Sequence, residues 1–211
     1  MKHNQMAGHD GMNTVRRAAD WAGISLTAGQ LALLGDLADW LVAEAIPAGG
    51  LGPAEGSVVH SRHLADSLLF ATPWRSRPGS PATILDIGAG VGLPGLPLAI
   101  CWPTSRVTLL ERSARRSDLA KRAVRLLGLE NVEVATTQMR EWETTAELLV
   151  CRAVSSPDRL RGDLRRLLDP SGVAVIGGSH HTLPNYQGFS TCRIPSNILG
   201  NPVWLLIMDK T

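Results

Sequence analysis

Four glycines recur at short intervals directly after an apolar run. Gly88, Gly90, Gly92 and Gly95 follow the segment Thr83–Ile87. The apolar segment predicts a buried strand, and the glycines predict a turn whose backbone approaches a ligand closely and aims free amide groups at it. A Cβ atom at these positions would either fill the space of the ligand or require a strained backbone with positive φ. The stretch therefore predicts a strand, a ligand-binding turn and a helix after it.

The acid Asp86 distinguishes two classes of cofactor that bind at such a turn. Gly90-x-Gly92-x-x-Gly95 fits the dinucleotide pattern, which alone is a weak signal. Asp86-x-Gly88-x-Gly90-x-Gly92 is instead the signature of methyltransferases that use S-adenosylmethionine. A carboxylate would repel a pyrophosphate, whereas it can accept hydrogen bonds from the ammonium group at the methionine end of S-adenosylmethionine. We therefore expect S-adenosylmethionine as the cofactor.

A second acid, Glu111, supports a nucleoside ligand. It directly follows the apolar segment Arg106–Leu110, a little over twenty residues past Gly88. An acid at this position of a nucleotide-binding sheet binds ribose hydroxyls. We expect Asp86 and Glu111 to hold the two ends of the ligand. A glycine turn that only packs a helix on a sheet is the less favoured alternative, because four glycines at near-alternating positions occur together with a correctly spaced acid.

The order of the predicted elements places these residues in an α/β fold. Helical periodicity predicts helices at residues 14–23, 27–45, 58–71, 113–127 and 159–168. Short apolar runs predict strands at residues 83–87, 106–110, 132–135, 148–151 and 173–176, with a turn at 169–172 and two final strands at 188–194 and 203–208. The alternation predicts a mostly parallel, Rossmann-like sheet of the class I methyltransferase kind, with a C-terminal antiparallel hairpin and an N-terminal helical extension. We expect a flexible tail over residues 1–11, a helical cap over 12–75 and an S-adenosylmethionine-binding methyltransferase domain over 76–211.

The composition indicates a soluble protein. With 211 residues, 44% hydrophobic residues and a net charge of +2, the chain is ordinary for a globular protein. No apolar run approaches the length that spans a membrane, and the N-terminus lacks the apolar core of a signal peptide. Three widely spaced cysteines predict reduced thiols rather than a disulfide framework or a zinc site. We expect a cytoplasmic protein that does not bind membranes.

Histidine and arginine clusters each allow two interpretations. His60 and His63 are three residues apart on a predicted helix, but no third ligand has suitable spacing, so packed or solvated rings are favoured over a metal site. His180 and His181 are predicted to lie in a polar loop. Two basic clusters are predicted to be solvated helix faces more readily than RNA-binding surfaces. Their members are Arg112, Arg115, Arg116, Lys121, Arg122 and Arg125, and then Arg159, Arg161, Arg165 and Arg166.

The sequence shows no Ser-His-Asp set, no paired-carboxylate site and no P-loop. This fits a methyl transfer to a nitrogen that already has an exposed lone pair, which needs alignment and desolvation more than an acid or a base. Guanine N7 is such a nitrogen, with no proton to remove.

Several motifs together resemble the RsmG (GidB) family, which methylates N7 of a guanine in the 16S RNA of the bacterial small ribosomal subunit. The resemblance extends over about residues 30 to 180. The motifs are His63-Leu64-Ala65-Asp66-Ser67-Leu68, the turn from Asp86 to Gly95 with its Leu93-Pro94-Gly95 ending, Leu126-Leu127-Gly128-Leu129-Glu130-Asn131-Val132, and Cys151-Arg152-Ala153.

The resemblance implies roles for particular residues. Gly88 and Leu93 would line the S-adenosylmethionine site, and Met139-Arg140 occupies the positions that flank the adenine in the family. Arg152 would lie beside the cofactor, facing the substrate, where a guanidinium can hold a phosphate or the cofactor carboxylate. The implied partner is small-subunit ribosomal RNA.

The chain also departs from the family pattern. Met139-Arg140 replaces the usual Ala-Glu pair, Gly177-Gly178 replaces Lys-Gly, and Gly50-Leu51-Gly52 replaces Asn-Leu-Thr. These departures leave two alternatives open. One is a diverged methyltransferase that acts on a small molecule or another RNA, and the other is a non-catalytic nucleotide- or RNA-binding module of the same fold.

Overall fold

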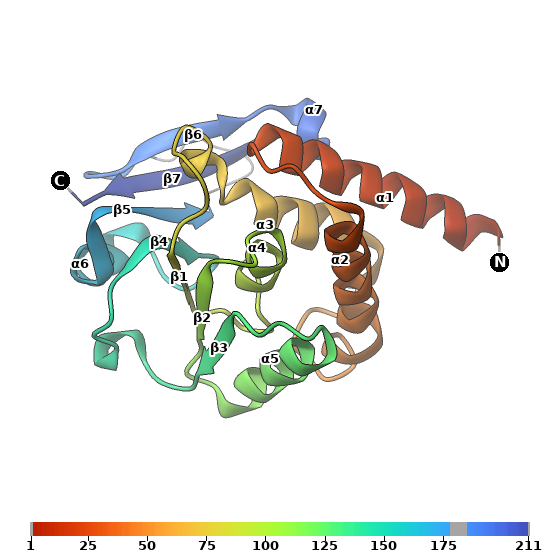
Figure 1. Cartoon of the computed structure of the whole chain (residues 1–211), viewed down its shortest axis with the longest axis horizontal. Helices are drawn as coiled ribbons and strands as arrows, with labels where there is room; N and C mark the ends of the chain where they lie inside the picture. Colours follow the sequence, from red (N-terminus) through yellow and green to blue (C-terminus); the bar gives the residue numbers. More distant parts are fainter. Residues whose placement is uncertain (1, 178–184, 211) are drawn as a thin grey trace.

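A mostly parallel sheet forms the centre of the protein (Figure 1). The computed structural model describes residues 2–177 and 185–210. Within them the strands are β1 (Thr83–Ile87), β2 (Arg106–Leu110), β3 (Val132–Ala135), β4 (Ala146–Cys151), β5 (Leu168–Gly177), β6 (Ser190–Ile194) and β7 (Val203–Asp209). Their order in the sheet is β3-β2-β1-β4-β5-β7-β6. The first five strands run parallel, and β7 is antiparallel to both β5 and β6, which confirms the predicted sheet and its terminal hairpin.

Helices cover the two faces of the sheet unequally (Figure 1). The α-helices are α1 (Lys2–Trp21), α2 (Ala28–Trp40), α3 (Asp66–Leu69), α4 (Gly95–Cys101), α5 (Ala114–Leu126), α6 (Pro157–Leu167) and α7 (Ser196–Leu199). Shorter 3-10 and π turns are η1 (Leu41–Ala45), η2 (Glu55–Val58), η3 (Val59–Ala65), η4 (Thr72–Trp74) and η5 (Met139–Glu141). In Figure 1, α6 lies on one side of the sheet and α1 to α5 lie on the other. The start of α2 is fixed by a capping box, in which Thr27 and Gln30 bond each other's backbone amide groups.

The alternation of side chains along each strand separates the core into two clusters. In β1, Ile84 packs with the N-terminal helices, α4 and α5, whereas Leu85 and Ile87 pack with Leu160 and Leu164 of α6. The first cluster joins residues of α1 and α2 directly to residues of the strands. The N-terminal helices therefore form one core with the sheet, and the division into a cap over 12–75 and a domain over 76–211 stays a prediction.

The structure differs from the predicted elements at four places. The helix predicted at 27–45 is divided into α2 and η1. The helix α1 begins at Lys2, whereas the first predicted helix begins at residue 14, and Gly11 packs against the ring of His60; the flexible tail over residues 1–11 stays a prediction. The strand β5 begins at Leu168, because residues 169–172, predicted as a turn, form an irregularity in its pairing with β4. The helix predicted at 58–71 is divided into η2, η3 and α3. No helix in the described part of the chain has the length and apolar character needed to span a membrane.

Candidate functional site

A cavity of about 610 Å³ opens at the carboxyl ends of β1, β2 and β4. Its wall includes Gly88 after β1, Glu111 after β2, Met139-Arg140 of η5 and the segment Ala153–Ser155 after β4. In a parallel sheet, this edge is where ligands bind, because the loops that leave the strands diverge there. The volume lies in the range of pockets that hold small ligands.

The glycine turn is shaped partly by the protein's own packing. At Gly88, which has a φ of +69°, an added Cβ would lie 2.3 Å from Cγ2 of Val154. At Gly95, an added Cβ would lie 2.3 Å from Leu109 and 2.8 Å from the carboxylate of Asp86. A Cβ at Gly92 would likewise lie 2.4 Å from Leu96, so three of the four glycines make room for side chains of the protein, and the expectation that a Cβ would meet only the ligand or a strained backbone is incomplete.

The amide groups of the turn are already bonded within the protein. Gly88 and Ala89 donate to the carbonyl of Leu110, at 2.8 and 3.1 Å. Gly90 donates to Oε2 of Glu111 at 3.0 Å, and Gly95 donates to Oδ2 of Asp86 at 2.7 Å. The prediction that the turn aims free amide groups at a ligand is wrong for these four residues, because carbonyl and carboxylate oxygens of the protein bond them. A turn of this kind offers little to a pyrophosphate.

Asp86 lies beneath the turn and is fully buried. Its Oδ2 holds the first turn of α4 through Gly95, while its Oδ1 has no hydrogen-bond partner among the described residues. Burial raises the pKa of Asp86 to about 7, against the opposing effects of the Gly95 hydrogen bond and the positive charge of Arg152. Asp86 does not lie on the cavity wall, so its contact with a cofactor stays a prediction. The unused acceptor and the raised pKa both indicate a carboxylate that a nearby cation would stabilise.

Glu111 lies on the cavity wall, with 3% of its surface exposed. Its Oε2 accepts from Gly90 and its Oε1 accepts from the amide of Ser113 at 2.8 Å. Arg116 lies 3.8 Å from the same carboxylate. These contacts fix the orientation of the carboxylate and leave acceptor sites on both oxygens, which suits hydroxyl groups of a ligand.

Arginines surround the mouth of the cavity. Arg112 and Arg116 approach from the start of α5, Arg140 from η5, and Arg159 from α6. Other arginines of the two basic clusters hold the fold instead: Arg115 donates to the carbonyl of Ala48, for example. The basic clusters therefore divide into cavity-lining members and structural members, a distinction that spacing along a helix does not reveal.

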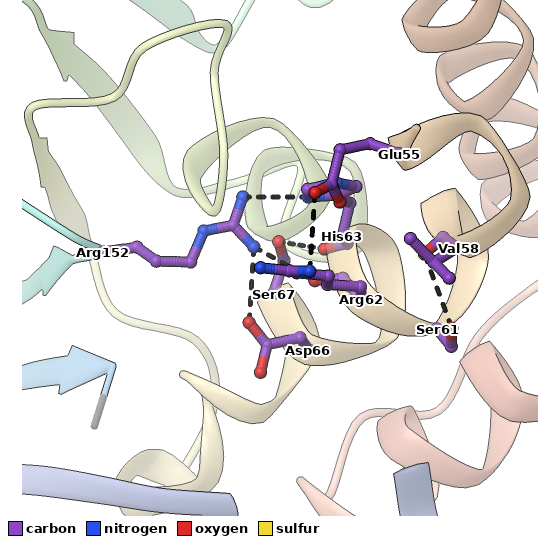
Figure 2. Close-up of polar contacts among 8 residues, drawn as sticks. All are labelled: Glu55, Val58, Ser61, Arg62, His63, Asp66, Ser67 and Arg152. Atoms are coloured by element: carbon purple, nitrogen blue, oxygen red, sulfur yellow. Dashed lines mark hydrogen bonds and ion pairs between the residues drawn. The ribbon is translucent and has the colours of Figure 1, made fainter. Parts of the chain in front are cut away.

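The side chain of Arg152 points toward His63 and Asp66 of the N-terminal helices (Figure 2), and Arg152 is not among the residues that line the cavity. Its Nη1 donates to Oδ2 of Asp66 and to the carbonyl of Arg62, both at 3.3 Å. Its Nη2 lies 3.5 Å from Nδ1 of His63, whose Nε2 lies 2.9 Å from Oε2 of Glu55. The predicted position of Arg152 facing a substrate stays a prediction, and the partners that hold it were missed. The spacing of His63 and Asp66, three residues apart on one helical face, was the available signal.

The structure brings four of the predicted site residues together on the cavity wall: Gly88, Glu111, Met139 and Arg140. The other five lie behind the wall or beside it: Asp86, Gly90, Gly92, Leu93 and Arg152. Of the departures from the family pattern, Gly177 lies next to Arg152, and Gly50 packs on Val91. Gly178, His180 and His181 lie outside the described residues. Within residues 2–177 and 185–210, no three histidine, cysteine or acidic side chains gather as a metal site would require.

Comparisons with known proteins identify relatives of this chain. The ribosomal RNA small subunit methyltransferase G of Acidothermus cellulolyticus is 34% identical over 139 residues, which cover 65% of this chain and 60% of that protein. The protein of the same name from Chlorobaculum tepidum is 32% identical and covers 74% of this chain and 73% of that protein. The chain spans between 51% and 60% of the length of three such relatives.

The likeness to solved structures concerns the fold alone. A mutant of MtNAS in complex with S-adenosylmethionine superposes with a TM-score of 0.58 at 16% identity, covering 85% of this chain and 73% of that chain. The match to a family model is more specific, since it extends over residues 37–188 and includes the glycine turn, η5 and Arg152. The chain therefore belongs to the GidB family, which is described as rRNA small subunit methyltransferase G.

Proposed function

We propose that this protein is an S-adenosylmethionine-dependent methyltransferase that acts on small-subunit ribosomal RNA, with N7 of a guanine as the acceptor. The choice of cofactor rests on one observation: the amide groups of the glycine turn are already hydrogen-bonded to oxygens of the protein. Carboxylates of Asp86 and Glu111 take up the amides of Gly95 and Gly90, so the site favours a ligand with hydroxyl groups and positive charge over one with a pyrophosphate.

The residues of the cavity fit this cofactor. Glu111 would accept hydrogen bonds from the ribose, and Met139 of η5 would contact the adenine. The free Oδ1 of Asp86 supports a place for the ammonium group near the end of β1. When bound, S-adenosylmethionine supplies a methyl group on a positively charged sulfur, which a nucleophile can attack directly.

The chain's contribution to the reaction would be orientation and exclusion of water. Guanine N7 carries a lone pair and no proton, so no general base is needed. The arginines at the cavity mouth, Arg112, Arg116, Arg140 and Arg159, give this edge a positive charge that would hold RNA phosphates and keep the base in line with the sulfur. An enzyme of this kind would work in the cytoplasm, where ribosomal subunits assemble.

Two measurements test the proposal. Calorimetry with S-adenosylmethionine and, separately, with NAD is expected to show binding of S-adenosylmethionine only. Tritium transfer from labelled S-adenosylmethionine to small ribosomal subunits that lack the modification is expected for the native protein and, at S-adenosylmethionine concentrations below its dissociation constant, about tenfold to a hundredfold less for Glu111→Ala. Binding of NAD alone would favour a dehydrogenase, and binding of neither ligand would favour a non-catalytic module.

A second candidate function rests on Arg140. This residue lines the cavity with its side chain 72% exposed, at a position where the family usually carries an acid. The alternative is a methyltransferase that acts on another RNA or on an acidic small molecule. A cation at this position would bind the negative charge of such a substrate. Binding of S-adenosylmethionine without methyl transfer to small subunits would favour it.

A further inference from the structure

A chain of four polar side chains joins the N-terminal helices to the end of β4 (Figure 2). Glu55 bonds His63 at 2.9 Å, His63 faces Arg152 at 3.5 Å, and Arg152 bonds Asp66 at 3.3 Å. The side chains are mostly removed from water, with exposed fractions of 8% for His63, 12% for Asp66, 21% for Arg152 and 22% for Glu55. We call these four residues the Arg152 network.

Hydrogen-bond chemistry fixes the tautomer of His63. A guanidinium has donors only, so a hydrogen bond between Arg152 and His63 at this distance of 3.5 Å requires Nδ1 of His63 to be the acceptor. The ring proton then sits on Nε2, where it is donated to the carboxylate of Glu55. Burial and the charge of Arg152 lower the pKa of His63, against the opposing effect of Glu55, which agrees with a neutral ring.

The network lies next to the cavity through the backbone of Arg152. The three residues that follow it, Ala153 to Ser155, form part of the cavity wall. Ala153 has a φ of +54°, a conformation that a residue with a side chain adopts only when its surroundings hold it. The side chain of Val154 lies so close to Gly88 of the glycine turn that an added Cβ there would be 2.3 Å from its Cγ2. Movement of Arg152 would therefore be transmitted to the wall of the cavity.

We propose that His63 is a positioning residue for Arg152: as the Nε2–H tautomer held by Glu55, it cooperates with Asp66 to anchor the guanidinium and so fixes the cavity wall at Ala153–Ser155. The inference rests on the proposed function, because it concerns the same cavity. His63 exchanges no proton with a substrate in this role. It acts only through Arg152.

The arrangement makes the anchor sensitive to acid. A second proton on His63 would place a donor at Nδ1 against the donors of Arg152 and add a positive charge beside it. The charged groups that face the ring are Glu55 from η2, Arg62 from η3 and Arg152; Asp66 of α3 faces Arg152. The helices α1, α2 and α7 also pack on η3, and none of their described residues contributes a charge that shifts the pKa of the ring. While His63 is neutral, the two negative charges of the acids equal the two positive charges of the arginines. Protonation of His63 would add a third positive charge, repel the guanidinium and so release Arg152.

A spectroscopic experiment tests the geometry without any assay of activity. The full-length protein labelled with ¹⁵N-histidine is titrated by NMR, with His63 assigned from its loss in His63→Gln. We expect the Nε2–H tautomer and a pKa below 6.5, which rises in Arg152→Ala and falls in Glu55→Gln. The Nδ1–H tautomer, or a pKa that is the same in Arg152→Ala, would overturn the proposal.

A double-mutant cycle then tests the functional part. His63→Gln is expected to lower kcat for methyl transfer by at least about tenfold in the native background, and by less than about twofold in Arg152→Ala. Equal losses in both backgrounds would show that His63 does not act through Arg152. The matched control is His60→Gln on the same element, whose ring lies against Gly11 and which is expected to leave kcat unchanged. Thermal denaturation of each variant separates unfolding from loss of positioning.

The two experiments separate this inference from the proposed function. If the native protein methylates no ribosomal subunit, the proposed function fails, and the cycle is measured on the dissociation constant of S-adenosylmethionine instead. If S-adenosylmethionine does not bind either, the NMR titration alone decides whether His63 holds Arg152.

Discussion

Asp86→Asn is expected to change how the stability of the protein depends on pH. The carboxyl group of Asp86 is fully buried, and its pKa is raised from 3.8 to about 7, with burial as the largest cause. The native state therefore binds the proton more tightly than the unfolded chain. The contribution of this proton to the free energy of unfolding is fully present below pH 3.8, the ordinary pKa of the group. It decreases as the pH rises above that value and is lost as the pH passes the native-state pKa of about 7.

The size of this change in stability follows from the difference between the two pKa values, 3.8 in the unfolded chain and about 7 in the native state. At 1.36 kcal/mol per pKa unit, the raised pKa corresponds to about 4 kcal/mol across the whole window and about 3 kcal/mol between pH 5 and pH 8. Asparagine has the same shape, retains an oxygen that can accept from Gly95, and has no charge to bury. We expect native protein to lose about 3 kcal/mol of unfolding free energy relative to Asp86→Asn between pH 5 and pH 8.

Urea unfolding of the two proteins at pH 5, 6, 7 and 8 measures this difference. Titration of His63 occurs in both proteins and cancels from the comparison. A difference in unfolding free energy that stays constant with pH would show that the pKa of Asp86 is not raised by its burial. A difference of opposite sign would show that its charged form is the one the fold favours.

Four further predictions follow from the site and its surroundings. Binding of S-adenosylmethionine at pH 6.5 is expected to release a proton from native protein and not from Asp86→Asn, because a bound ammonium group lowers the pKa of Asp86. Calorimetry in buffers of different ionisation enthalpy measures the number of protons released, and equal release from the two proteins would contradict this prediction. Glu111→Ala is expected to weaken this binding by about tenfold to a hundredfold, since hydrogen bonds to a charged group contribute about 1.5–3 kcal/mol, with Glu111→Gln in between. Gly88→Ala is expected to lower the free energy of unfolding by about 3 kcal/mol, because it combines positive φ with a clash against Val154. The control Gly128→Ala has a similar φ and open space around its Cβ, so it should lower the free energy of unfolding by about 1 kcal/mol; equal losses in the two variants would refute the clash. Iodoacetamide at pH 8 is expected to label Cys192 before Cys101 and Cys151, whose pKa values burial raises to about 12, and mass spectrometry of the labelled peptides shows the order.

The strands were the best predicted part of the fold. The segments 83–87, 106–110 and 132–135 have the same bounds in the structure as in the sequence-based prediction. The first two are short, mostly apolar runs whose residues are largely buried on both faces of the parallel sheet, so local hydrophobicity is sufficient to define them; β3 lies at the edge of the sheet, is only partly buried and was marked by the alternation of Val132 and Val134. The helical segments were harder to delimit, because polar residues are compatible with both a helix and a tail, as at the start of α1.

The candidate site was predicted less completely, for a physical reason. Glu111 and Gly88 reach the cavity because each directly follows a strand, and strand ends of a parallel sheet converge at one edge. The partners of Arg152 are 86 and 89 residues away in the chain, at Asp66 and His63, and depend on how η3 packs over the sheet. Asp86 presents the opposite case: its position after the apolar run indicated a ligand contact, while its side chain bonds the helix that follows. The spacing of His63 and Asp66 indicates a shared helical face, but a single sequence does not show that this face meets Arg152.

Mass spectrometry of small-subunit ribosomal RNA tests the central claim most directly. RNA would be compared from cells that lack the protein and from the same cells supplied with native protein or with Glu111→Ala. We expect one 7-methylguanosine to be absent in the first, restored by native protein and restored to a clearly smaller extent by Glu111→Ala. An unchanged set of methylated guanosines in all three would contradict the proposed function.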